Sequence, residues 1–76
     1  MKIKELDTIV LENDLPTHGL RRGDIGAVVA IYSPDEIEAE FVTASGRTQA
    51  LIHLHTSQIR PISPQDIPAV RNLDAA

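Results

Sequence analysis

The sequence predicts an all-β protein of about five short antiparallel strands, arranged as a small barrel or an open sandwich. Short runs rich in β-branched and aliphatic residues are separated by turn signals about every eight to twelve residues, which is typical of these folds. No segment with helical spacing is long enough to predict a full helix. The only aromatic residues are Tyr32 and Phe41, so aliphatic side chains suited to strands must fill the interior.

The length and composition predict one domain with a thin margin of stability. A chain of 76 residues buries only about 60% of the surface that its unfolded form exposes. Domains of this size often gain stability from disulfides, a metal or oligomerisation. The chain has no cysteine, which excludes disulfides and thiolate zinc sites. We therefore expect an economical core, a partner chain, or both.

The net charge of the chain disfavours nucleic acid as a partner, and the short length of its uncharged runs disfavours a membrane span. The formal net charge is −4, so the chain repels polyphosphate unless its cations gather on one face. The longest uncharged run, Ile25 to Pro34, is far too short to span a bilayer. Nothing resembles a signal peptide, and a cytoplasmic location is expected.

The first two strands are predicted within Glu5–Asp14 and over Ile25–Tyr32. The second run is apolar on both faces, as expected for a central strand. Gly26 lies inside it, where a glycine suits a bulge or a close approach of another group to the backbone. The turn before this strand contains Gly23, which can adopt positive φ without steric cost.

The third and fourth strands are predicted over Glu36–Thr43 and Thr48–His55, joined by a hairpin turn at Gly46. The first of these alternates between apolar residues and glutamates, which predicts a half-buried strand with an acidic outer face. A helix is the competing interpretation, because Glu and Ala are good helix formers. The period of two and the flanking turns favour the strand.

A short helical turn with Thr56 or Ser57 as its cap is expected next, followed by a closing strand over Arg60–Ile62. These elements complete a domain of residues 1–62. Residues 63–76 form a tail that is either extended or a short helix. Its three larger apolar residues, Ile67, Val70 and Leu73, recur at helical spacing, so the helical alternative is one short turn after Pro68.

The stretch "LRRGDIGAVVAIY" resembles the start of many SH3-like barrels, with a basic loop, a Gly-Asp turn and a valine-rich strand. It is similar to the KOW motif of ribosomal and transcription-elongation proteins, and to the small barrels of photosystem accessory subunits and of the nitrile hydratase β-subunit. Together with "ELDTIVL", "AEFVTASGRTQALIHL" and "QIRPI", it more closely resembles a family of short bacterial proteins of unknown function. This resemblance covers roughly residues 5 to 62. It implies a closed SH3-like barrel and no particular activity.

The arginines of this stretch are candidate contacts for phosphate. Arg21 and Arg22, joined by Arg47, could bind RNA as in a KOW-like protein. The alternative is that the nearby glycines serve only turn geometry and that the arginines are solvated. Neither a dinucleotide fingerprint nor a P-loop is present, because a strand follows the glycines and no Gly-Lys-Ser/Thr does.

The remaining polar residues do not form a catalytic or metal-binding motif. His53 and His55 project to the same side of a strand and could share a metal, but no motif fixes further ligands. The alternating glutamates are explained by solubility and by protection of a sheet edge. No nucleophile signature surrounds the hydroxyl residues. We therefore expect neither an enzyme nor a cofactor.

These features favour a protein-binding module without catalytic activity. The small core suggests a protein partner or a homodimer, with Ile67, Val70 and Leu73 or a strand edge as the contact. Two alternatives remain open. One is an accessory or antitoxin-like partner of an enzyme or toxin encoded beside it, and the other is a KOW-like RNA- or ribosome-binding protein.

Overall fold

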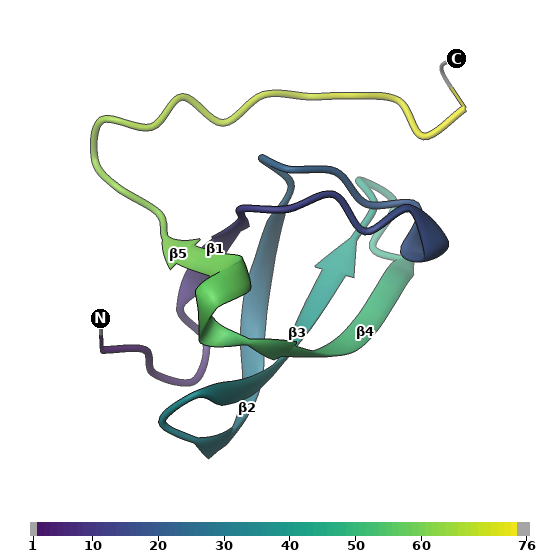
Figure 1. Ribbon diagram of the computed structural model, residues 1–76. Coiled ribbons are helices and arrows are strands. Elements are labelled where there is room, and N and C mark those ends of the chain that lie inside the picture. The colour runs from purple at the N-terminus through teal and green to yellow at the C-terminus, as the bar shows by residue number, and fades with distance from the viewer. Residues whose placement is uncertain (1, 75–76) are drawn as a thin grey trace.

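A computed structural model describes residues 2–74, and it shows one five-stranded antiparallel sheet with two short 3-10 turns (Figure 1). The elements in chain order are β1 (Thr8–Leu11), η1 (Pro16–His18), β2 (Ile25–Ser33), β3 (Glu36–Val42), β4 (Thr48–His55), η2 (Thr56–Gln58) and β5 (Ile59–Pro61). The strand order across the sheet is β4-β3-β2-β1-β5. The all-β prediction and the strand interpretation of the glutamate-rich segment are confirmed.

The sheet is curved around one core but is not closed, so the expected closed barrel is wrong. All five strands contribute to a single buried cluster, which a flat sheet could not do. Within residues 2–74, β4 and β5 form the two edges and do not pair with each other. The short β5 already pairs with β1, and its last residue, Pro61, has no N–H to donate to a further strand.

The boundaries of β2 to β5 agree with the predicted ones to within one residue. The first strand, Thr8–Leu11, lies within the predicted segment Glu5–Asp14, and it begins only at Thr8 because Glu5 and Leu6 form a turn in which Leu6 has a positive φ of 71°. The last strand is shifted by one residue and begins at Ile59, whose buried side chain sits opposite Leu11.

Gly26 lies against the ring of Phe41, as its position within a strand predicts. A Cβ atom placed on Gly26 would lie 2.7 Å from Cε2 of Phe41. Phe41 is the one aromatic residue of the core, and its neighbours there include Val28 and Ala39. The absence of a side chain at Gly26 thus makes the space that the ring fills.

The cap of η2 is His55, so the expectation of Thr56 or Ser57 is wrong. The Nδ1 atom of His55 accepts a hydrogen bond from the Ser57 N–H at 3.0 Å. In return, the His55 N–H donates to Oε1 of Gln58 at 2.9 Å. The His55 side chain thus accepts a backbone N–H of the turn, and the Gln58 side chain accepts the backbone N–H of His55, which is the arrangement of a capping box.

The tail is extended, and the helical alternative after Pro68 is wrong. Residues 66–72 have no regular secondary structure, and residues 75 and 76 lie outside the described part of the chain. After β5 the chain turns and runs back across the open end of the sheet (Figure 1). In residues 2–74, no helix has the length and apolar character needed to cross a membrane.

Candidate functional site

An ion pair between Arg71 and Asp24 holds the tail to the loop before β2. Arg71 donates from Nε to Oδ1 of Asp24 at 2.8 Å and from Nη2 to Oδ2 at 2.6 Å. Its Nη2 atom also donates to the Gly19 carbonyl at 2.9 Å. This two-pronged geometry is the strongest form of an arginine–carboxylate contact.

The turn that carries Asp24 fixes the position of its carboxylate. The Arg21 N–H donates to Oδ2 of Asp24 at 2.8 Å, and the Asp24 N–H donates to the Arg21 carbonyl at 3.0 Å. Gly23 completes the turn with a φ of 94°, as expected from the sequence. Burial raises the pKa of Asp24, but the hydrogen bonds from Arg71 and from the Arg21 N–H outweigh it, and the net pKa is lowered. Asp24 is therefore an anion at neutral pH.

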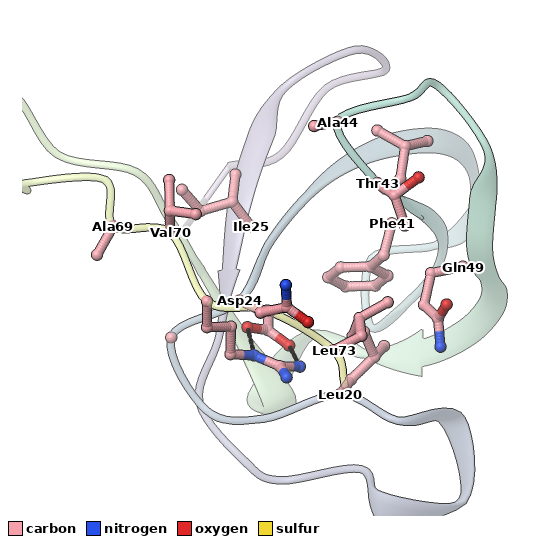
Figure 2. A pocket seen from close by; sticks show the side chains of 14 residues that line it. Leu20, Asp24, Ile25, Phe41, Thr43, Ala44, Gln49, Ala69, Val70 and Leu73 are labelled. Atoms are coloured by element: carbon pink, nitrogen blue, oxygen red, sulfur yellow. Dashed lines mark hydrogen bonds and ion pairs between the residues drawn. The ribbon is translucent and has the colours of Figure 1, made fainter. Parts of the chain in front are cut away.

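An open groove of about 500 Å³ lies between the tail and the end of the sheet (Figure 2). One wall comes from the loop before β2 and from the end of β3, and the other comes from tail residues 69–73. Leu73 lies on the side of the groove with Leu20 and Phe41, and Val70 lies on the side with Ile25 (Figure 2). The groove is thus mainly apolar around one ion pair.

A second ion pair fixes the direction in which the tail leaves β5. Arg60 donates from Nη1 and Nη2 to the carboxylate of Asp66 at 2.8 and 2.9 Å, and the Ser63 N–H donates to the same carboxylate at 2.6 Å. The Arg60 hydrogen bonds and the Ser63 N–H lower the pKa of Asp66 to about 2. The chain is therefore bent at residues 63–66 and directed back over the sheet.

Beyond this bend the tail is held only lightly. Among the described residues, no backbone hydrogen bond joins residues 67–74 to the strands. Ile67 is 90% exposed and Val70 is fully exposed, whereas Leu73 is 40% exposed. The hold on the tail comes from Arg71 together with the partial burial of Leu73.

The structure separates the residues that the sequence singled out. Val70 and Leu73 line the groove, whereas Ile67 lies on the tail before it. The side chains of Arg21, Arg22 and Arg47 are exposed and do not line it. The Arg22 N–H donates to Oδ1 of Asp14 at 2.8 Å, so an acidic side chain sits beside the two adjacent arginines.

Asp24 and Arg71 are the residues that sequence reasoning missed. Arg71 is the only cation of residues 63–76, which marks it as a residue in need of a partner. Nothing in the spacing identifies that partner, because the two residues are 47 positions apart.

His53 and His55 lie on the outer face of β4. Tyr32 donates from its hydroxyl to Oε1 of Glu38 at 2.9 Å, which raises the Tyr32 pKa, and its ring centre lies 5.1 Å from that of His53. The Nε2 atom of His53 lies 3.8 Å from Oε2 of Glu36. His55 is engaged in the cap of η2. Across residues 2–74, no three His, Cys, Asp or Glu side chains are grouped as metal ligands would be.

The comparisons with known proteins give one match. A family model described as a domain of unknown function, DUF4926, matches residues 5–61, which contain β1 through β5. The tail with Arg71 follows the matched segment. No curated protein and no solved structure matches the chain. The match spans most of the sequence and agrees with the expected membership of an uncharacterised family, and the chain therefore belongs to the DUF4926 family.

Proposed function

We propose that this protein is a protein-binding module without catalytic activity, and that its contact surface is the tail with the groove beneath it. The observation that carries the proposal is the exposure of Ile67 and Val70 on an extended segment. Apolar side chains that the protein leaves in water mark an interaction site when they border further apolar surface, and Val70 lines the mainly apolar groove. The strand order and the 3-10 turn before β5 support an SH3-like arrangement, a fold that is used for many kinds of binding.

The chemistry of the groove supports binding rather than catalysis. Asp24 is the only carboxylate among its lining residues, and Arg71 holds it ionised with a lowered pKa. A carboxylate of that kind is a weak base at neutral pH, where general-base catalysis favours a pKa near 7. The groove thus offers apolar surface and one fixed charge, which suit recognition of a polypeptide in the cytoplasm.

Photo-crosslinking from the tail tests this proposal. The full chain is prepared with the photoreactive residue p-benzoylphenylalanine in place of Val70, of Ile67, or of Leu6, and it is irradiated in cells of its native host. Leu6 is the matched control, because it is an exposed leucine near the other end of the chain. We expect one discrete adduct from positions 67 and 70 and none from position 6. Equal labelling from all three positions, or none from the tail, would contradict the proposal.

The same variants identify a homodimer if that is the partner. Irradiation of the purified protein then gives an adduct of twice the chain mass. Sedimentation of the wild type shows a dimer that is lost when Ile67 and Val70 are replaced by serine. A larger adduct found only in cells identifies a different partner, including the accessory role beside an enzyme or toxin.

The alternative of an RNA-binding function predicts that the protein binds RNA, and we expect that it does not. Asp14 and Asp24 accept hydrogen bonds from the backbone N–H groups of Arg22 and Arg21, so the local field around the arginines is mixed. We expect no binding of generic single-stranded RNA in a filter assay at low salt. Binding that falls steeply with salt and disappears in the Arg21→Ala/Arg22→Ala variant would favour the RNA-binding function instead.

A further inference from the structure

The tail contacts the groove through two residues separated by one. Arg71 places its guanidinium on Asp24 and on the Gly19 carbonyl, and Leu73 lines the groove with Leu20. Both residues line the groove, and a turn begins at Leu73. The part of the tail that the groove recognises is therefore an arginine followed two positions later by an aliphatic residue.

The groove requires a cation whichever segment occupies it. The side chain of Asp24 is only 18% exposed, and with Arg71 in place its carboxylate is ionised at neutral pH. If Arg71 leaves, a partly desolvated carboxylate loses its partner, which is costly. A guanidinium replaces this partner better than an ammonium, because its planar fork directs Nε and Nη2 to the two carboxylate oxygens while Nη2 also donates to the Gly19 carbonyl.

The tail is built so that its outer part can lift while its base stays in place. The Arg60–Asp66 ion pair holds the bend, whereas residues 67–74 have no backbone hydrogen bond to the described strands. Ile67 and Val70 gain no burial from docking in this position. Opening of the tail must therefore break the contacts of Arg71 and Leu73, but with few other buried apolar contacts and no backbone bonds it loses little else.

From these features we propose that the tail is an internal ligand of the groove and competes with an extended segment of a partner protein. That segment carries an arginine with an aliphatic residue two positions further on, and it takes the places of Arg71 and Leu73. When it binds, the displaced tail is free to lay Ile67 and Val70 on the partner. This inference rests on the proposed protein-binding function and adds the chemistry of the partner to it.

The test uses a labelled nine-residue peptide, DIPAVRNLD, which copies residues 66–74 of this chain. Its binding to the full-length wild type is compared with binding to the full-length Arg71→Ser/Leu73→Ser variant, whose tail can no longer compete. A tethered segment acts at an effective concentration of the order of millimolar, so the NMR titration is carried to a few millimolar peptide. We expect the variant to bind the peptide at least about tenfold more tightly than the wild type does.

Two controls make the result specific. A peptide with Arg71→Glu should not bind the tail-released variant, since it brings a second negative charge to Asp24. Adding Asp24→Asn to that variant should also abolish binding, while Arg22→Ser at the exposed neighbouring position should not. Because Asp24→Asn also removes part of a turn, its fold is checked by the methyl spectrum of the core, and the peptide variant gives the same test on an unaltered protein.

Three outcomes would overturn the proposal. These are no binding to the tail-released variant, equal binding to the wild type, or equal binding of the Arg71→Glu peptide. Adducts from position 70 without peptide binding would overturn the internal-ligand proposal alone and leave the protein-binding function standing. Loss of the position-specific adducts would instead overturn the proposed function.

Discussion

Replacing Gly26 by valine is expected to leave the protein largely unfolded at room temperature. Even a single Cβ at this position would lie 2.7 Å from Cε2 and 2.9 Å from Cδ2 and Cζ of the Phe41 ring. The ring is almost fully buried and belongs to the core cluster, so a shift of the ring disturbs the packing of that cluster. Overpacking of this kind costs about 1–3 kcal/mol for small insertions, and the branched side chain of valine adds two further methyl groups.

The expected loss is large compared with what the chain can tolerate. At about 0.05–0.15 kcal/mol per residue, a domain of this length has a total stability of about 4–11 kcal/mol. Gly26→Ala should lower the free energy of unfolding by about 1–3 kcal/mol. The lower entropy of alanine in the unfolded chain offsets only about 0.4–1 kcal/mol of that. Urea unfolding followed by circular dichroism measures both variants.

A double-mutant cycle separates the clash from a general intolerance of β2. Phe41→Leu removes the ring atoms nearest to Gly26, so Gly26→Ala should cost less in that background than in the wild type. Ala27→Val is the matched control, since it adds bulk one residue along on the opposite face of the strand. Equal costs of Gly26→Ala in both backgrounds would show that the ring is not the cause.

The same residues show why the strands could be predicted from the sequence. Alternation in Glu36–Val42 is a local property that specifies which side chains face the core, and Gly26 marks a close approach because no other strand residue lacks a side chain. Whether the sheet closes does not follow from a local sequence pattern. It depends on whether β4 and β5 meet, which no residue pattern within either strand specifies.

The predictions of the η2 cap and of the path of the tail were wrong for different reasons. Thr and Ser are common caps, but His55 has the acceptor atom one residue earlier, and Gln58 stands where it can complete the pair. In the tail, the helical spacing of Ile67, Val70 and Leu73 lies in too short a segment to form a helix alone. Docking through Arg71 then selects the extended form.

Loss of the Asp24 carboxylate is expected to release the tail and to destabilise the turn before β2 together. Asp24→Ala removes both hydrogen bonds from Arg71 and the one from the Arg21 N–H. Hydrogen bonds to charged groups contribute about 1.5–3 kcal/mol, and we expect a loss near the middle of that range. Arg71→Ala should cost about 1 kcal/mol, because its side chain is partly solvated and Asp24 keeps its bond within the turn. The double variant should be no less stable than Asp24→Ala.

The pH dependence of the stability difference between the wild type and Asp24→Ala identifies the ion pair as the source of that difference. Since the pKa of Asp24 is lower in the folded protein than its usual 3.8, the ionised carboxylate stabilises the fold fully above about pH 4, and this contribution is lost as the pH falls through the lowered folded value. Asp66, with its pKa of about 2, is present in both proteins and cancels in the comparison. The stability gap between the wild type and Asp24→Ala should therefore be constant from pH 5 to 7 and narrow steadily below about pH 4. A gap that stays unchanged down to pH 2 would mean that the charge of Asp24 does not hold the tail.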